Sequence, residues 1–366
     1  MLGISLYPDK TTIEQDMAYL DVAQSLGYRR VFTSMLQVDP KNPSQSVRRI
    51  RESCQAAVAR DMLVTIDIHP LVFKFIGCEP TDLSYFHEMG ISTVRMDAVV
   101  DGRTEASMTH NPYGIGIELN MSNNNPMLDL VRSFGPDTKL LSGSCNFYPQ
   151  RYTGMSLEGF RAAAQRYREN GLNTAVFITS QEARVSPWPV CEGACTLEIH
   201  RDLPLREQAR HLQMLALADD WIIGNAFAGK TELADVAEEY GRRTATLSIE
   251  IDPQATQFER SLILEHAQRY RGDASEYMIR SCAGRALYTD KRLPAHLNRP
   301  IHMGDILVLN EAYGQYKAEV QIALRERPAD NRVNVVGRVV PRELSLIQLL
   351  SPCQEFRFEE VYEHAQ

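Results

Sequence analysis

The segment Met89–Asp97, with the sequence MGISTVRMD, contains the junction that decides the fold. An amphipathic stretch ends at Gly90, and a short apolar run follows from Thr93 to Asp97. A glycine just past a helix end takes the left-handed backbone conformation that closes the last turn, and the chain can then enter a strand. The segment therefore predicts a helix followed by a strand.

The same junction recurs on both sides of this segment. Gly27 precedes the apolar run 30–34, and Gly171 precedes the run 174–178. Eight runs in all have the length and composition of strands: 3–7, 30–34, 63–69, 93–97, 116–120, 139–145, 175–179 and 221–224. Strands that alternate with helices pair in parallel, and eight such units close into a barrel. The sequence predicts an α/β fold, a (β/α)8 TIM-type barrel over residues 1–241.

An open doubly wound sheet is the alternative arrangement of the same units. No glycine-rich phosphate loop follows the first run, which disfavours it. After about Gly241 the sequence pattern changes. Strand-like runs occur at 245–251, 305–310, 317–323 and 333–340, and only the segment 257–267 is a good candidate for a helix. Residues 242–366 are therefore expected to form a separate, small, mostly antiparallel β domain.

Composition excludes several classes of protein. The 366 residues carry 39 basic and 47 acidic side chains, a net charge of −8, which argues against a nucleic-acid partner. We expect no signal peptide and no membrane span, because a basic segment with an apolar run is missing at the start and no run of about 18 apolar residues occurs. The seven scattered cysteines are typical of reduced thiols in a cytoplasmic protein.

Polar residues at the carboxyl ends of the expected barrel strands are the candidates for a site, since TIM-barrel active sites lie there. Side chains two residues apart share one face of a strand. Four successive strands offer such pairs: Asp67 with His69, Arg95 with Asp97, Glu118 with Asn120, and Asn146 with Tyr148. Each has a structural alternative, such as a helix cap, an ion pair for Arg95 or a packing role for His69. Three carboxylates on consecutive strands nevertheless favour a function, because burying charge is costly.

Three chemistries fit this end of the barrel. Glycoside hydrolysis needs two carboxyl groups, one protonated and one ionised. Metal-assisted isomerisation or hydrolysis would use Asp67, His69, Glu118 and His200 as ligands. Schiff-base chemistry needs a lysine at a strand end, and Lys139 lies at the wrong, amino end.

The segment 145–156 (CNFYPQRYTGMS) leaves the sixth expected strand with an amide, aromatic rings and a guanidinium. Tyr148 offers a stacking face for a sugar, and Arg151 can meet a phosphate or carboxylate with paired donors. This composition suits a sugar with an anionic substituent. The alternative is a structured loop whose aromatic side chains pack on the barrel rim.

Several motifs together resemble one known family. They are GISLYP at 3–8, RMD at 95–97, IELNMS at 117–122, NFYP at 146–149 with Thr153-Gly154, TLEIHR at 196–201, and Arg299-Pro300 with GDILV at 304–308. The chain resembles the bacterial 6-phospho-N-acetylmuramidases, glycoside hydrolases with a barrel followed by a cyclophilin-like domain. The resemblance covers essentially the whole chain, and NFYP followed by Thr-Gly is its most specific part.

The resemblance implies hydrolysis of the bond between 6-phospho-N-acetylmuramic acid and N-acetylglucosamine during cell-wall (peptidoglycan) recycling in the cytoplasm, without metal or cofactor. This disaccharide is doubly anionic. The side chains expected to bind it are Arg95, Asn120, Asn146, Tyr148, Arg151, His69, His200 and Arg201.

Our own inference assigns catalysis to Asp97 and Glu118, on adjacent strand ends, with Asp67 in reserve. A carboxyl separation near 5 Å would mean retention and one near 8 Å inversion, roughly. Assistance by the 2-acetamido group of the substrate is a further option. A metal-dependent sugar-phosphate isomerase or hydrolase, and a non-enzymatic sugar-phosphate-binding protein, remain as alternative functions.

The second domain has two interpretations. Prolyl isomerase activity would be an analogy from the fold alone. We expect instead that it completes the pocket of the barrel, or of a neighbouring subunit in a homo-oligomer, with residues such as Arg280, Asn310 or Tyr313.

Overall fold

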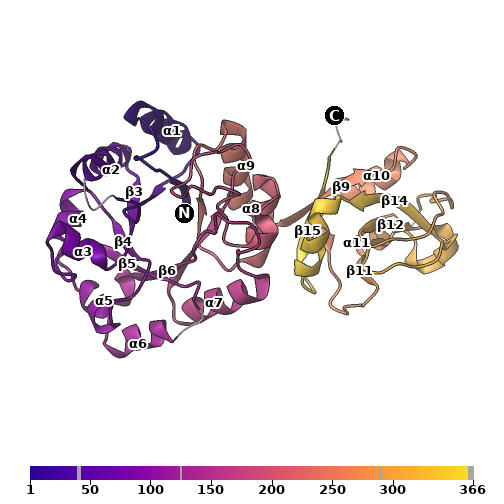
Figure 1. Cartoon of the computed structure of the whole chain (residues 1–366). Coiled ribbons are helices and arrows are strands. Elements are labelled where there is room, and N and C mark those ends of the chain that lie inside the picture. The colour runs from indigo at the N-terminus through magenta and orange to yellow at the C-terminus, as the bar shows by residue number, and fades with distance from the viewer. Residues whose placement is uncertain (39–42, 124–125, 289, 362–366) are drawn as a thin grey trace. The chain divides into compact units, whose positions relative to one another are not determined.

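The computed structural model describes the chain except for residues 39–42, 124–125, 289 and 362–366 (Figure 1). The chain divides into two compact units. The first comprises Met1–Leu212 and Ala216–Gly241, and the second comprises Gln213–Leu215 and Arg242–Gln366. Among the residues described, every helix is too short or too polar to cross a bilayer.

The first unit is a closed barrel of eight parallel strands, counted over the described residues. The strands are β1 (Leu2–Ser5), β2 (Arg30–Ser34), β3 (Leu63–Ile68), β4 (Thr93–Met96), β5 (Gly116–Asn120), β6 (Leu141–Ser144), β7 (Asn173–Ile178) and β8 (Asp220–Ile223). Each pairs with the next, and β1 closes the ring on β8, with Gly3 opposite Ile222. The predicted (β/α)8 barrel is confirmed.

Helices follow the strands and surround them (Figure 1). They are α1 (Ile13–Ser25), α2 (Pro43–Val58), α3 (Leu71–Ile76), α4 (Ser84–Glu88), α5 (Arg103–Met108), α6 (Met127–Ser133), α7 (Leu157–Glu169), α8 (Leu205–Leu215) and α9 (Lys230–Gly241), with the 3-10 turns η1 (Thr138–Leu140) and η2 (Glu198–His200). The junction glycines behave as predicted, since Gly27, Gly90 and Gly171 have φ of 89°, 80° and 69°. A side chain at these three positions would strain the backbone.

Several barrel strands are shorter than the sequence predicts, and the largest difference is in β6. The run 139–145 yields only Leu141–Ser144, because η1 occupies the preceding residues. Asp137 caps this turn by accepting a hydrogen bond from the Lys139 backbone N–H at 3.0 Å. The strand β6 therefore begins at Leu141, directly after this turn.

The second unit contains a seven-stranded sheet among the described residues, in the order β10-β15-β9-β14-β12-β13-β11. The strands are β9 (Ala245–Ile251), β10 (Gln268–Arg269), β11 (Met278–Ser281), β12 (Asp305–Leu309), β13 (Val320–Ala323), β14 (Val333–Val339) and β15 (Glu355–Glu360); the other elements are α10 (Gln257–Leu264), α11 (Ala283–Leu287), η3 (Glu311–Tyr316) and η4 (Pro341–Leu349). Next to its two edge strands, the Arg271 N–H donates to the Arg280 carbonyl at 3.0 Å, so the sheet is a nearly closed barrel.

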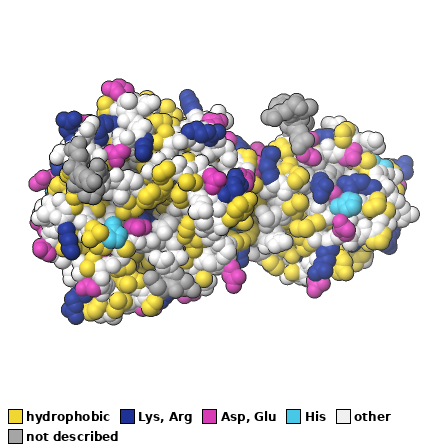
Figure 2. Space-filling view, in the orientation of Figure 1, with side chains coloured by type: hydrophobic (Ala, Val, Ile, Leu, Met, Phe, Trp, Pro, Cys, Tyr) yellow, Lys and Arg dark blue, Asp and Glu magenta, His cyan; other side chains and the backbone are white. Residues whose placement is uncertain are grey.

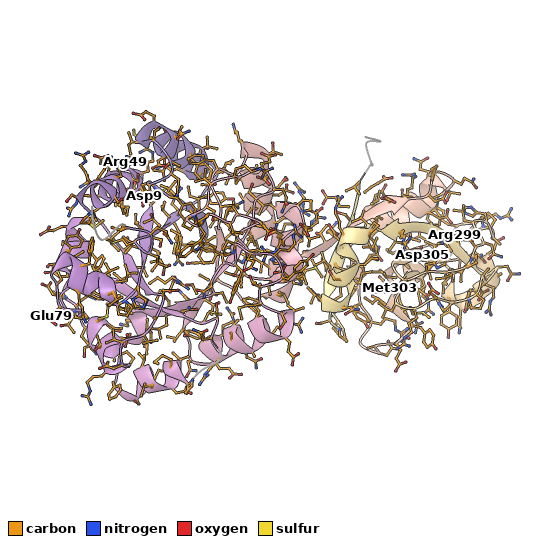
Figure 3. The ribbon with its side chains drawn as sticks, viewed as in Figure 1. Asp9, Arg49, Glu79, Arg299, Met303 and Asp305 are labelled. Atoms are coloured by element: carbon orange, nitrogen blue, oxygen red, sulfur yellow. The ribbon has the colours of Figure 1, made fainter. Side chains whose placement is uncertain are left out.

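Its core is built from the inward faces of these strands, and includes Leu247, Ile249, Ile306, Ile322 and Phe356. All strand pairs are antiparallel except β15 with β9. Arg299 and Asp305, labelled in Figure 3, form a two-pronged ion pair at 2.8 and 3.1 Å. This pair fixes the loop that leads into β12.

Candidate active site

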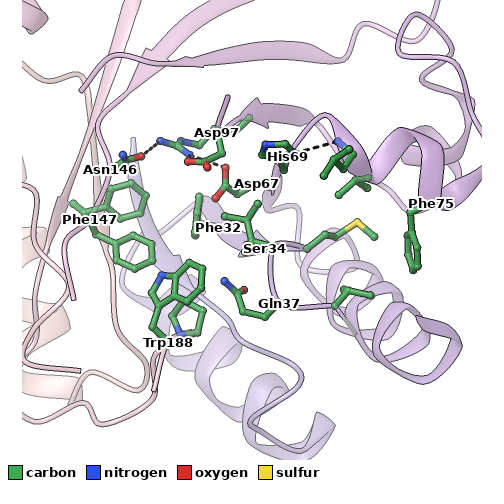
Figure 4. Close-up of a pocket in the computed structure, with 18 of the residues that line it drawn as sticks. Phe32, Ser34, Gln37, Asp67, His69, Phe75, Asp97, Asn146, Phe147 and Trp188 are labelled. Atoms are coloured by element: carbon green, nitrogen blue, oxygen red, sulfur yellow. Dashed lines mark hydrogen bonds and ion pairs between the residues drawn. The ribbon is translucent and has the colours of Figure 1, made fainter. Parts of the chain in front are cut away.

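A pocket of about 740 Å³ opens at the carboxyl ends of the barrel strands (Figure 4). Its polar lining residues include Ser34, Gln37, Asp67, His69, Lys74, Arg95, Asp97 and Asn146, and its aromatic ones are Phe32, Phe75, Phe147, Phe177 and Trp188. This is the end of a TIM barrel at which active sites lie. The volume suits a small ligand.

Arg95, on β4, holds the floor of the pocket together. Its side chain is only 2 % exposed and donates to three neighbours. Nη1 donates to Asp67 Oδ1 at 2.6 Å, Nη2 to Asn146 Oδ1 at 2.6 Å, and Nε to Ser144 Oγ at 2.7 Å. Every nitrogen of the guanidinium thus has an acceptor, and the side chain is fixed in place.

Two carboxyl groups meet at this guanidinium (Figure 4). Asp67 Oδ1 lies 2.6 Å and Asp97 Oδ1 lies 3.6 Å from the same atom, Nη1 of Arg95. Asp67 is buried, whereas Asp97 has 34 % of its side-chain surface exposed. Burial raises the pKa of Asp67 to about 6; Arg95 opposes this shift and the charge of Asp97 adds to it. One carboxyl group therefore takes up a proton near neutral pH, and the other opens toward the pocket.

Glu118 occupies a different level of the barrel. Its Oε2 accepts from Arg30 Nη2 at 2.5 Å, and Arg30 Nη1 donates to Asp220 Oδ2 at 2.6 Å. Arg30 is the first residue of β2, so this second cluster lies in the barrel interior, toward the amino ends of the strands. Glu118 is not among the described residues that line the pocket.

The stagger of barrel strands explains this placement. In the pairing of β4 with β5, Glu118 lies opposite Arg95. Asp97 follows the end of β4, two residues after Arg95. The corresponding residue of β5 is Asn120, about 6–7 Å beyond Glu118 along the strand. Asn120 Nδ2 donates to the Asp97 backbone carbonyl at 3.1 Å. The structure therefore brings Asp97 together with Asp67 and Asn120, and Glu118 together with Arg30.

Two of the other predicted binding residues, His69 and Asn146, line the pocket. His69 Nδ1 accepts from the Leu71 backbone N–H at 3.2 Å. Tyr148 is half-buried behind the rim and is not among the described lining residues. Its backbone N–H donates to the Cys195 carbonyl at 3.0 Å.

The remaining predicted cations do not enter the pocket. Arg151 forms a two-pronged ion pair with Asp202 at 2.6 and 2.9 Å on the surface. Arg201 donates to both carboxylate oxygens of Glu198 at 2.7 Å. His200 is fully buried and its Nε2 lies 2.7 Å from His211 Nδ1.

Glu198 connects the loop that contains Tyr152 and Gly154 to the segment that contains Arg201. Its two oxygens accept from the backbone N–H groups of Tyr152 and Gly154 at 2.8 and 2.7 Å. The hydrogen bonds from Arg201 hold the pKa of Glu198 down, at about 2. The Thr-Gly and TLEIHR motifs therefore clamp two loops together.

Sequence reasoning missed the aromatic wall and one cation. Phe177 lies 5.0 Å from Phe32 and 5.2 Å from Phe147, between ring centroids, in edge-to-face contacts. Trp188 is one of only two tryptophans in the chain, and its position between two prolines was a usable signal. Lys74, on α3, is the only lysine or arginine besides Arg95 among the described lining residues.

The family model "6-phospho-N-acetylmuramidase, N-terminal" matches residues 2–238, and the model "6-phospho-N-acetylmuramidase, C-terminal" matches residues 245–359. The chain belongs to the 6-phospho-N-acetylmuramidase family. It is thus a glycosidase, as the resemblance predicted, and the family implies a phosphorylated muramic sugar as substrate.

Two solved structures are similar to this chain. The chain is similar to an uncharacterized B. cereus protein, with 38 % identity, a TM-score of 0.89, and coverage of 98 % of this chain and 99 % of that one. A conserved Enterococcus faecalis protein of unknown function shares the fold, with 23 % identity, a TM-score of 0.73, and coverage of 100 % and 97 %. A search of the curated proteins found no match.

The ligand set of the metal-dependent alternative is not assembled in this family member. His200 pairs with His211, and Glu118 pairs with Arg30, so neither joins Asp67 and His69. Among the described residues, no group of three or more His, Cys, Asp or Glu side chains has an arrangement that suits a metal ion. The site is instead a pair of carboxyl groups on an arginine, beside aromatic rings.

Proposed function

We propose that this muramidase cleaves the glycosidic bond between 6-phospho-N-acetylmuramic acid and N-acetylglucosamine in the barrel pocket. The observation that carries the proposal is the pair of carboxyl groups, Asp67 and Asp97, that share one nitrogen of Arg95 at the pocket floor. Glycoside hydrolysis needs one carboxyl group that gives a proton and one that is ionised. The environments of the two groups differ accordingly, since Asp67 is buried with a raised pKa and Asp97 is partly exposed.

Asp67 is the proposed proton donor. A pKa of about 6 keeps part of this carboxyl group protonated near neutral pH, as a general acid requires. Asp97, more open to the pocket, is the proposed ionised partner. It would attack the anomeric carbon itself or orient the 2-acetamido group of the substrate for attack.

The spacing supports retention of configuration. The Oδ1 atoms of the two groups lie closer together than the sum of their distances to Arg95 Nη1, 2.6 and 3.6 Å. That limit falls below about 6.5 Å, where the spacing of inverting enzymes begins. An attacking water between the carboxyl groups would have too little room.

The remainder of the pocket fits a phosphorylated sugar. Phe147 and Trp188 offer apolar faces for a sugar ring. Lys74 carries an exposed ammonium group at the edge of the pocket and is the proposed phosphate contact. We infer that Lys74, not Arg151 or Arg201, distinguishes the phosphorylated substrate.

The proposed setting is cell-wall recycling in the cytoplasm. All seven cysteines lie in the described part of the chain and all are free thiols. Free thiols persist in reducing compartments, which supports this setting.

The direct test compares the phosphorylated disaccharide with its unphosphorylated twin. We expect the full chain to release N-acetylglucosamine from the first and at most a small fraction of that rate from the second, measured by chromatography of the products. Equal cleavage of both would refute the substrate assignment. No cleavage of either would refute the proposed reaction.

A further inference from the structure

The second unit contains a cavity of its own, of about 1120 Å³, which no part of the proposed reaction uses. Its lining includes Arg280, Tyr313, Tyr316, Gln321, Arg327 and Arg332. The basic lining side chains come from β11 and from the loop between β13 and β14, and the acidic ones are Asp273, Glu319 and Asp330. A cavity of this size, with aromatic and charged walls, has the form of a small-molecule site.

Arg327 is the unusual group in this cavity. Its Nε and Nη2 atoms are buried and have no hydrogen-bond partner in the described part of the chain. Burial lowers the pKa of this guanidinium. Its backbone is held on both sides, since the N–H and carbonyl groups of Arg327 and Ile301 bond each other at 3.0 Å. Arg327 is half-buried as a whole, but buried N–H groups without an acceptor are costly, so these two atoms call for a partner.

The other arginines of the cavity already have partners. Arg280 Nε donates to Glu319 Oε1 at 2.7 Å, and Arg332 Nη2 donates to Asp330 Oδ2 at 2.7 Å. Asp330 is close enough to raise the pKa of Arg327, but both of its oxygens already accept hydrogen bonds from Arg332. Among the described residues of this cavity, Arg327 is thus the arginine whose buried Nε and Nη2 atoms have no acceptor.

Aromatic rings stand beside this cation. Tyr313 and Tyr316 lie edge to face with centroids 6.1 Å apart, and the Arg332 guanidinium covers the Tyr313 ring at 4.4 Å. The buried side chains of Ile301, Leu309 and Val333 complete an apolar wall. A ligand that fits has an anionic group for Arg327 and a flat or apolar body for these side chains.

We propose that this cavity is a second binding site, for a small organic anion that joins a carboxylate or a phosphate monoester to a ring. Arg327 supplies the charge, turning its buried N–H groups toward the anion, and the tyrosines supply the contact surface. Carboxylate and phosphate are the groups that a guanidinium binds with paired donors. The site is independent of the barrel reaction.

The experiment measures binding of three probes to the full chain by isothermal titration calorimetry: phenyl phosphate, benzoate and the neutral benzyl alcohol. We expect at least one anion to bind and the alcohol to bind at least tenfold more weakly. Arg327→Gln should weaken the bound anion at least tenfold, about 1.4 kcal/mol. Arg327→Lys, which keeps the charge, should lose less affinity than Arg327→Gln.

Controls separate this site from the barrel and from loss of folding. Arg325→Gln, an exposed neighbour outside the cavity, should bind as the parent does. Lys74→Gln, which removes the barrel cation, should leave the Arg327-dependent binding unchanged. Anion binding that Arg327→Gln does not weaken, although its circular dichroism matches the parent, would overturn the proposal, as would the absence of anion binding. Turnover of the disaccharide should be the same in Arg327→Gln, so failure here leaves the proposed function standing.

Discussion

Two clusters at the barrel strands, formed around Arg95 and around Arg30, each join one arginine to two carboxylates, and their environments differ. In the first, Arg95 binds Asp67 and approaches Asp97 at the wall of a pocket. In the second, Arg30 binds Glu118 and Asp220 inside the barrel. The chemical groups are nearly the same, yet only the first has a carboxylate that opens to a cavity. We infer that exposure of a carboxylate to a ligand, and not residue type, would make the first cluster reactive and the second structural.

Asp97→Asn tests this difference with the largest expected effect. The substitution removes the ionised group but keeps the size of the side chain, so kcat on the phosphorylated disaccharide should fall about 10³-fold, within the range of acid-base and nucleophilic groups. The unfolding temperature should stay within a few degrees of the parent. A kcat within tenfold of the parent would remove Asp97 from the mechanism.

Glu118→Gln applies the same change to the interior cluster. Removing one charge of a buried pair is costly, and we expect the free energy of unfolding to fall by about 3 kcal/mol, measured by urea denaturation. Below the unfolding transition kcat should change less than tenfold. If kcat falls 10³-fold while the fold remains stable, the roles that we give to the two clusters are reversed.

The pH dependence sharpens the assignment within the first cluster. A general acid acts in its protonated form, so kcat/KM should fall about tenfold per pH unit above the pKa of Asp67, about 6. Asp67→Asn should be much less active and should lack this limb of the profile. An unchanged limb in Asp67→Asn would assign the proton to another group.

The smallest effect concerns the edge of the pocket. Lys74→Gln removes the proposed phosphate contact, and KM for the phosphorylated disaccharide should rise about tenfold, as expected for one charge-assisted hydrogen bond. Lys139→Gln, an exposed lysine at the amino end of the barrel, is the matched control. A similar KM in both variants would move phosphate recognition away from Lys74.

Local patterns predicted most of the barrel. The glycines before β2, β4 and β7 marked its junctions, and Asp67, Arg95 and Asp97 were found because side-chain alternation is local. The depth of Glu118 was not predictable in this way. It depends on the stagger of strands around the closed barrel, which no single strand encodes.

Side-chain partners account for other differences. Arg151 resembles an anion-binding residue in the sequence, but its partner Asp202 lies far along the chain and is brought to it by the folded loops. Arg201 is paired locally, with Glu198 three residues earlier. In the second unit β10, β11 and β15 were missed. The six residues of β15 pair in parallel with β9, with Phe356 opposite Ala245, a contact between segments far apart in the sequence. The net charge needs no folded contact to be known from the sequence. On the face shown in Figure 2, basic and acidic side chains are mixed.

We propose that the bond to be cleaved lies between Asp67 and Asp97. A crystal structure of Asp97→Asn with the phosphorylated disaccharide bound would show this directly. We expect the glycosidic oxygen within hydrogen-bond distance of the Asp67 carboxyl group, and the anomeric carbon facing residue 97. A disaccharide bound with its glycosidic oxygen out of reach of both side chains would contradict it.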